Sequence, residues 1–451
     1  MSDAFSAEHE IAGQARNDAF KTDHSNAVLA GSHGHGPATR NAAKPVGSRA
    51  ERVTSFELAD IPIPTGREEE WRFTPFHKFE PLFNPIADPG AISVEFEQPA
   101  PREVKIELTV EPFDSTEPIQ TETTTHLISF DIEQHIPSSD PRFGQAGKPG
   151  DRAAVSAWHA ADSGTIITIP TDSWLTDPLM VRVSGQTGQQ GSQGAVKLLI
   201  QAEPKSKGVV VIDHTGSALL NETIELVVAD GAHLTVVALQ DWASDAVHAA
   251  SHRAVIGNDA TLKHIVVSLG GDAVRITPDA AFAGAGGSVE MLGLYFADAG
   301  QHLEHRLFVD HGQPNCTSRV TYKGALQGDN AHTVWVGDVL IQANATDTDT
   351  YEMNRNLVLT KGARADSVPN LEIETGEIIG AGHASATGRF DDEQLFYLMA
   401  RGIPEKEARR LVVRGFFAEL IGQIGVPEVE QRLLASIEGE LATSMSENNG
   451  G

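Results

Sequence analysis

The sequence contains a single cysteine, Cys316, among 451 residues. One thiol excludes a disulfide framework within the chain and also a metal site built from several cysteines. Aromatic residues make up only 6% of the chain, whereas glycine is frequent, with 42 residues. This combination favours many short strands with tight turns over a helical bundle. We interpret Cys316 as a small buried apolar group rather than a nucleophile, because lone thiols more often take that role.

Positive charge is scarce, since 34 Lys and Arg residues stand against 62 Asp and Glu residues, for a net charge of -28. Such an acidic chain disfavours a nucleic-acid backbone or an anionic membrane as a partner. The apolar runs, for example GVVVI at 208–212, are too short to cross a bilayer, and the first residues are acidic, unlike a secretory signal. We therefore expect a cytoplasmic globular protein.

Several motifs of hydrolytic enzymes are also missing. The only Gly-Lys pair, Gly147-Lys148, is followed by Pro149, where a phosphate-binding loop needs Ser or Thr. Neither G-x-S-x-G nor H-E-x-x-H occurs in the sequence. The chain is therefore not expected to hydrolyse ATP through such a loop.

The first 150 residues divide into two parts. Residues 1–50 are polar and aperiodic, which predicts a disordered tail; weak metal binding by its histidines is the alternative. We expect an N-terminal α/β cap over 51–150. In it, Trp71 follows Glu69 and Glu70 in a segment bounded by prolines, which predicts a short helix that buries an aromatic edge. Alternating segments at 104–110 and 126–132 predict half-buried strands.

From about 165 to 375, short β-branched strands alternate with turns. Three turns, at 230–232, 258–260 and 284–286, begin 28 and 26 positions apart. A spacing near 27 is typical of the coils of a β-solenoid, although a β-sandwich also has short strands and frequent turns. We favour the solenoid and assign the core to 151–385.

The end of the chain predicts helices, in a C-terminal domain over 386–445. Asp391 or Asp392 is a suitable N-cap, Gly402 is suited to end the helix, and Pro404 is suited to position N1 of the next one. The second helix has one apolar face, at Leu411, Val412, Phe416, Leu420 and Ile424. This face packs on the chain's own core or binds a separate subunit, and periodicity alone does not decide between them.

Histidines are the candidate ligands for a metal. His302, His305 and His311 cluster along one predicted strand, but 302 faces away from the other two, so we interpret them as solvated or core histidines. His383 lies in GAGHASATG, where small neighbours let another backbone approach closely. Its imidazole could bind iron or zinc, carry a proton, or serve only as a hydrogen-bonded structural group.

The stretches NLVLTKGARADSVPNLEI (356–373) and GHASATGRFDDEQLFYLMARGI (382–403), the helix through GFFAELI (415–421), and Glu-Glu-Trp-Arg at 69–72 resemble the SufB/SufD family of iron–sulfur cluster assembly proteins, the SufD type more than the SufB type. Two positions depart from the family pattern. Ala363 stands where SufB-type chains carry a cysteine, and Ala381 stands where SufD-type chains often carry one. Because thiolates usually hold such clusters, this chain is not expected to hold one stably alone.

The resemblance implies a mainly β fold, a right-handed parallel β-helix core between the N-terminal cap and the C-terminal helices. It implies a non-enzymatic scaffold subunit of a SufBCD complex, paired with a SufB-like subunit through the β-helix ends and with a SufC-like ATPase through the C-terminal helices. It also implies a transient iron–sulfur cluster shared with the partner, for which His383 would be the ligand or proton relay. We expect the partner contacts at Leu395, Phe396, Leu398, Arg401, Leu411 and Phe416.

Two other functions fit the same fold. A β-helix carbohydrate-active enzyme would need paired carboxylates beside the scissile bond, and no convincing pair is present in the sequence. A purely structural adaptor would use His383 only for packing.

Overall fold

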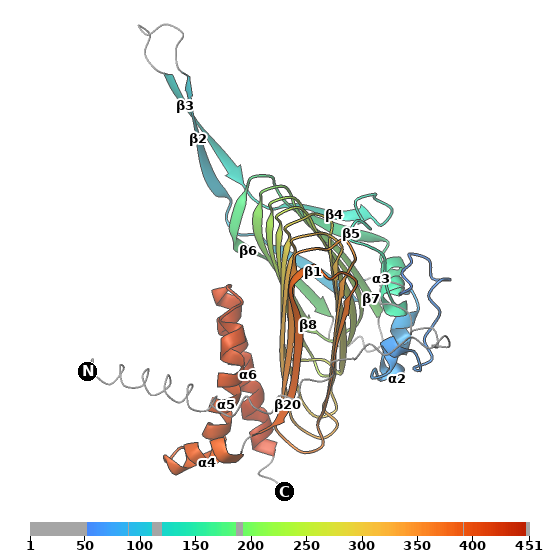
Figure 1. Cartoon of the computed structure of the whole chain (residues 1–451), viewed down its shortest axis with the longest axis vertical. Coiled ribbons are helices and arrows are strands. Elements are labelled where there is room, and N and C mark those ends of the chain that lie inside the picture. Colours follow the sequence, from blue (N-terminus) through green and yellow to red (C-terminus); the bar gives the residue numbers. More distant parts are fainter. Residues whose placement is uncertain (1–51, 89, 111–119, 186–192, 391, 448–451) are drawn as a thin grey trace, which may run out of the picture. The chain divides into compact units, whose positions relative to one another are not determined.

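The computed structural model describes residues 52–88, 90–110, 120–185, 193–390 and 392–447. Its core is a β-solenoid of about 8 turns, built from two nine-stranded sheets that enclose a common interior (Figure 1). The prediction of a mainly β protein with a parallel β-helix core and C-terminal helices is confirmed. The predicted tail at 1–50, with His9, His24, His33 and His35, lies outside the described residues, and the predicted domain boundaries stay predictions.

Each coil contributes one strand to each sheet, and neighbouring coils pair in parallel except at the edge strands β1 and β4, which are antiparallel. The first sheet is ordered β1 (Ile92–Glu97), β6 (Trp174–Gly185), β8 (Lys207–Gly216), β10 (His233–Trp242), β12 (Thr261–Ser268), β14 (Ser288–Ala297), β16 (Thr317–Leu326), β18 (Thr348–Val358) and β20 (Ile378–Arg389). The second sheet is ordered β19 (Arg364–Ile373), β17 (His332–Ile341), β15 (His302–His311), β13 (Ala273–Phe282), β11 (Val247–Ile256), β9 (Leu219–Val228), β7 (Gln193–Ala202), β5 (Ser163–Ile169) and β4 (Asp131–Pro137). A separate hairpin joins β2 (Arg102–Val110) and β3 (Gln120–Ile128).

A ladder of turns explains the repeat seen in the sequence. Gly231, Asp259 and Gly286 occupy equivalent positions in successive coils, and all three have positive φ angles, of 66°, 50° and 74°. The backbone N–H of each donates to a carbonyl in the turn of the next coil, at 2.8, 2.9 and 3.1 Å. Because few residues other than Gly, Asn and Asp adopt this conformation readily, the turn chemistry repeats with the coil. The third turn is therefore centred one residue later than the sequence pattern predicts.

The interior of the solenoid is filled by aliphatic side chains and by aromatic rings that fit over glycines. Tyr322 of β16 lies beside Gly293 of β14, and Tyr295 of β14 lies beside Gly324 of β16. A Cβ atom on Gly324 would be only 1.8 Å from Cε2 of Tyr295, so each glycine provides the space that the neighbouring ring fills.

Short helices from the first part of the chain cover the outer side of the second sheet. These are η3 (Glu69–Trp71), α2 (Phe76–Phe79), η4 (Glu80–Phe83) and α3 (Arg152–Ala160). Trp71 is 3% exposed and lies edge-on to Phe83, while the guanidinium of Arg275 lies 4.2 Å from the Trp71 ring. The predicted helix with a buried aromatic edge is therefore present.

Three helices follow the last coil: α4 (Asp392–Ala400), α5 (Glu405–Ile421) and α6 (Pro427–Glu447). Gly402 ends the first helical segment with a φ of 86°, as predicted. Pro404 is the N-cap of α5 rather than its first residue, a difference of one position. The sequence pattern predicts two helices here, and the described residues form a third, α6. Among the described residues, no helix combines the length and apolar character needed to cross a membrane.

The apolar faces of α5 and α6 pack on the outer side of the first sheet (Figure 1). Phe417 and Leu420 are fully buried there, against strand residues such as Val237 and Leu294. Lys323 reaches from β16 to the carbonyl oxygen of Phe416 at 3.1 Å and to the Glu419 carboxylate at 3.0 Å. Most of the predicted apolar stripe therefore belongs to the chain's own core.

Candidate functional site

His383 lies on β20, the last strand of the first sheet, and its side chain is exposed. Its parallel partner on β18 is Glu352, which in turn pairs with Val320 of β16, and Val320 pairs with Met291 of β14. In-register residues on parallel strands face the same side of the sheet, so these four side chains form one column. Neighbouring members of the column are about 4.8 Å apart, which is the spacing between adjacent strands. Met291, Val320 and Glu352 are each at most 2% exposed. His383 is exposed because it ends the column, with no further coil above it among the described residues.

Glu352 is a residue that the sequence analysis missed. It is 1% exposed, and neither of its carboxylate oxygens has a hydrogen-bond partner among the residues that the structure describes. Burial, helped by the negative charge of Asp338, raises the pKa of Glu352 to about 8. A carboxyl group that is neutral at pH 7 therefore lies directly beneath His383 in the column. In the structure, buried and more exposed residues alternate along β18, which places Glu352 on the inward face. The inward residues of this strand from Thr348 to Asn356 are all polar, so the sequence contains no apolar alternation that would have indicated this burial.

Ser367 and Ser385 extend this polar region across the two sheets. The hydroxyl of Ser385 on β20 donates to the hydroxyl of Ser367 on β19 at 2.8 Å, and Ser367 donates to Oδ1 of Asn354 at 2.7 Å. Asn354 donates to the hydroxyl of Tyr295 at 2.9 Å, deeper in the solenoid. A hydrogen-bonded chain thus leads from the surface near His383 into the interior.

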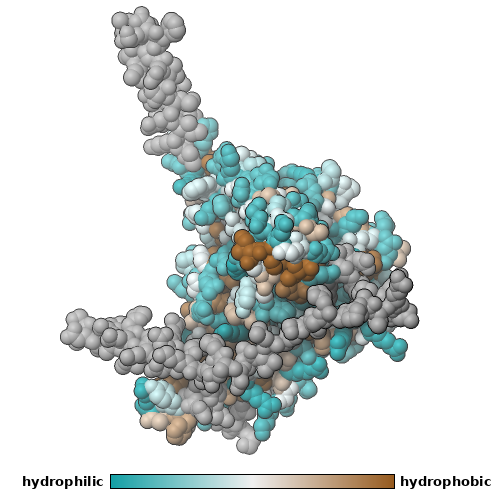
Figure 2. All heavy atoms as spheres, viewed as in Figure 1, coloured by the Kyte–Doolittle hydropathy of each residue, from teal (hydrophilic) through white to brown (hydrophobic). Residues whose placement is uncertain are grey.

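The last coil has an open edge. Strand β20 pairs with β18 and β19 pairs with β17, and neither has a second neighbouring strand within the described part of the chain. Ile379 on β20 is 72% exposed and Ile373 at the end of β19 is 43% exposed. Figure 2 shows a compact group of apolar side chains on a face that is otherwise mostly hydrophilic. Unpaired strand edges with apolar neighbours can accept a further strand from another chain.

The six predicted partner-contact residues divide into exposed and inward-facing groups. Phe396 is 73% exposed and Leu411 is 41% exposed, and Arg401 is exposed with its guanidinium 4.2 Å from the Tyr397 ring. The inward-facing group packs with the helix–sheet core and consists of Leu395, Leu398 and Phe416. Tyr397 and Met399, at 48% and 43% exposure, add to the outer surface of α4. The exposed side chains form an apolar surface without a partner among the described residues.

His302, His305 and His311 do not converge. His302 faces outward and its Nε2 lies 3.0 Å from the Glu304 carboxylate, whereas His305 and His311 face inward and bond Ser268 and Ser318. All three are at most 2% exposed, which agrees with their interpretation as core histidines. Cys316 is fully buried, and burial raises the pKa of its thiol, as suits a small interior group rather than a nucleophile.

Ala363 and Ala381 pack against the solenoid core near its open end. Because both residues are alanines, neither position supplies a thiolate ligand. His383 is therefore the one imidazole or thiolate ligand that β20 presents at this edge, and imidazole binds iron and zinc.

The fold defines a class of protein: a β-solenoid with helices packed along one sheet and an open last coil. Residues 184–416 match the family model described as SUF system FeS cluster assembly, SufBD core domain. Iron–sulfur cluster assembly SufBD family proteins of Mycobacterium bovis and Mycobacterium tuberculosis are 50% identical over 408 residues, covering 88% of this chain and 94% of each relative. The iron–sulfur cluster assembly protein SufD of Bacillus subtilis is 24% identical over 417 residues, covering 86% of this chain and 92% of that protein.

The chain belongs to the SufB/SufD family of the SUF iron–sulfur cluster assembly system. This membership confirms the resemblance found in the sequence and favours cluster assembly over the carbohydrate-active alternative.

Proposed function

We propose that this chain is the SufD-like, non-enzymatic scaffold subunit of a SufBCD-type complex that builds and transfers iron–sulfur clusters. The observation that carries the proposal is the position of His383 at the end of an otherwise covered column, on an open sheet edge. A SufB-like subunit would continue the sheet at β20 and provide the cysteine that this chain lacks. The nascent cluster is the cargo of the complex, held transiently between the two subunits.

The open edge supports this pairing in two ways. Unpaired backbone groups on β20 can hydrogen-bond a strand of the partner, and the exposed Ile379 and Ile373 can be buried by it. The carboxyl group of Glu352 and the serine chain beneath His383 leave the imidazole in a polar environment that a second subunit would close off from water.

The outer surface of α4 and α5 is suited to a SufC-like ATPase. Phe396, Tyr397 and Leu411 are exposed apolar side chains on helices whose opposite faces are already packed on the first sheet. Only Phe390 and Asp391 separate the end of β20 from the start of α4. Because Phe390 is buried in the helix–sheet core, a displacement of α4 by the ATPase would be passed to the strand that carries His383. ATP-driven closure of two SufC subunits would in this way open the SufB–SufD interface.

The test is co-expression with SufB-like and SufC-like chains, anaerobic purification, and measurement of iron, sulfide and visible absorbance. We expect His383→Ala to leave the three-subunit complex intact and to abolish cluster build-up. His233→Ala is a matched control, since His233 is also exposed and also lies in the first sheet, on β10, five strands from β20.

Normal cluster build-up in the His383→Ala complex would refute the role of the imidazole and favour the purely structural adaptor. Failure of the wild-type chain to co-purify with either partner would refute the scaffold proposal itself.

A further inference from the structure

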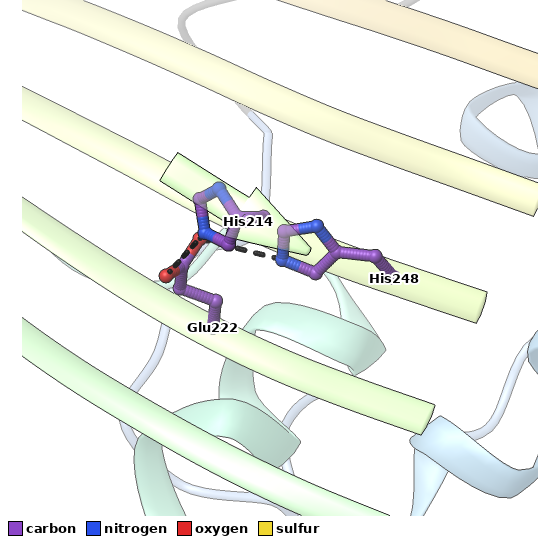
Figure 3. A group of neighbouring side chains, drawn as sticks. All are labelled: His214, Glu222 and His248. Carbon is purple, nitrogen blue, oxygen red and sulfur yellow. Dashed lines mark hydrogen bonds and ion pairs between the residues drawn. The ribbon is translucent and has the colours of Figure 1, made fainter. Parts of the chain in front are cut away.

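A second group of metal-binding side chains lies inside the solenoid, far along the first sheet from His383. His214 is on β8, Glu222 on β9 and His248 on β11, and all three side chains are fully buried (Figure 3). Six steps of strand pairing separate β8 from β20 in the first sheet. The group is therefore distinct from the cluster-assembly edge.

The strand register explains how these residues meet. Glu222 pairs with Ala250 on β11, so His248 and His252, two residues on either side of Ala250, face the same interior side. The small side chain of Ala250 leaves room for the carboxylate between the two imidazoles. His214 approaches from the opposite sheet. The sequence signal was present as H-A-A-S-H at 248–252, but the partner carboxylate is visible only in the fold.

The distances match the ligand shell of a small divalent ion. Nε2 of His214 lies 3.0 and 3.1 Å from the two oxygens of Glu222, and Nε2 of His248 lies 3.3 Å from Oε2. The three ligand atoms are all within 4.8 Å of one another. In a tetrahedral site with bonds of about 2.0–2.1 Å, neighbouring ligand atoms are about 3.3 Å apart. Nε2 of His252 lies 3.9 Å from Oε2 of Glu222.

The outer ring nitrogens already have the partners that orient metal-binding histidines. Nδ1 of His214 is 2.9 Å from the backbone carbonyl of Leu239, which can only accept, so Nδ1 carries a proton. Nδ1 of His248 is 2.9 Å from Oε1 of Gln240, which can accept its proton, and the indole N–H of Trp242 lies 3.2 Å from both of these atoms and can donate to Gln240. With Nδ1 protonated in both rings, an ion that displaced the proton from Nε2 of His214 would find a lone pair from each ring beside the Glu222 carboxylate.

One contact in this group is left incomplete. Nε2 of His248 lies 3.3 Å from Oε2 of Glu222, but within the described part of the chain it makes no hydrogen bond. A cation placed among the three ligand atoms would contact all of them at once.

We propose that Nε2 of His214, a carboxylate oxygen of Glu222 and Nε2 of His248 bind one divalent first-row transition-metal ion of the Zn²⁺ or Fe²⁺ class. His252 or a water molecule completes the shell. Two imidazoles and one carboxylate are a ligand set used for such ions. Because the site is enclosed, the ion enters as the chain folds and links the two sheets in the early coils.

The first measurement uses the wild-type full chain. It is produced with added zinc or iron, dialysed against a chelator, and its metal content is measured by mass spectrometry. We expect one ion per chain that resists the chelator. X-ray absorption should show a first shell of nitrogen and oxygen at about 2.0–2.1 Å with outer-shell scattering from imidazole.

The second measurement refolds the chain with Co²⁺ alone and records the visible d–d absorption. Glu222→Gln should weaken Co²⁺ binding by at least about 100-fold, since even changes around a metal site cost 10- to 100-fold. His311→Gln, a buried histidine on β15 bonded to Ser318, is the matched control and should bind as the wild type does.

The proposal is wrong if the wild-type chain carries no ion after production and after refolding with Zn²⁺, Fe²⁺ or Co²⁺, in which case His214 and Glu222 form a metal-free ion pair. It is also wrong if Glu222→Gln, folded by circular dichroism, keeps the ion. Should that variant fail to fold, the absorption spectrum of the wild type decides, because a shell without imidazole excludes this site.

Discussion

The buried carboxyl group of Glu352 predicts a defined pH dependence of stability. In the unfolded chain this group has a pKa of 4.5, and in the folded chain burial and the charge of Asp338 raise the pKa to about 8. Between these values the folded protein keeps the proton that the unfolded chain has lost. The stability from this group is therefore fully present below pH 4.5 and is lost as the pH rises to about 8.

The size of the effect follows from the width of this interval. Each pH unit corresponds to about 1.4 kcal/mol, so the loss between pH 4.5 and pH 8 is at most about 5 kcal/mol. The perturbation is Glu352→Gln, which keeps the size of the side chain and removes its ionisation. The buried amide adds a constant cost of about 1–3 kcal/mol, because in the described part of the chain no group hydrogen-bonds the side-chain oxygens at this position. The difference between wild type and variant should therefore shift steadily in favour of the variant from pH 5 to pH 8.

The assay is urea unfolding of both proteins at several pH values between 4.5 and 9. Glu374→Gln, an exposed carboxylate beyond β19, is the control and should show no such shift relative to the wild type. In the infrared, the carbonyl band of a protonated carboxyl group should be present at pH 7 in the wild type and missing in Glu352→Gln. Parallel stability curves for wild type and Glu352→Gln would refute the reasoning, because they would mean that Glu352 ionises normally in the folded chain.

Two further predictions concern packing. Gly324→Ala should destabilise the chain by at least about 1–3 kcal/mol, because the new methyl group would meet the Tyr295 ring at 1.8 Å; thermal unfolding measures this, and an unchanged midpoint would contradict the ring-over-glycine packing. Phe417→Ala should cost about 3–5 kcal/mol, since the ring is fully buried between α5 and the first sheet, whereas Phe396→Ala, at 73% exposure, should change stability by less than about 0.5 kcal/mol. In the co-expressed complex, Phe396→Ala should weaken binding of the SufC-like ATPase although it leaves stability nearly unchanged. If the Phe396→Ala complex bound the ATPase as tightly as the wild type does, the exposed surface of α4 would not be the contact.

Much of the fold could be predicted from local patterns. The turn residues Gly231 and Asp259 recur because each coil needs a left-handed residue at the same point, and this repeat is visible in the sequence. Gly402 likewise ends its helix for a local reason. The third turn was placed one residue early, since Ala285 and Gly286 are both small and only the coil-to-coil hydrogen bond shows which of them takes the left-handed conformation.

The candidate site was predicted in part. His383 stood out because small residues surround it, but its exposure follows from being the last member of a column, which the sequence does not show. Glu352 and Glu222 were missed because a lone glutamate in a strand is usually a solvated side chain. Their burial depends on which face of the strand points into the solenoid and on which side chains of the facing sheet lie opposite them.

The repeating coil, the terminal helices and the family could be predicted from the sequence, because turn chemistry, hydrophobic periodicity and family motifs are local properties. Three features could be seen only in the folded chain: which faces of α5 and α6 are covered, the position of β20 at the end of the sheet with His383 uncovered, and the meeting of His214, Glu222 and His248 inside the solenoid. Those outcomes depend on pairing between strands far apart in the chain, and such contacts follow from register and packing rather than from any single segment.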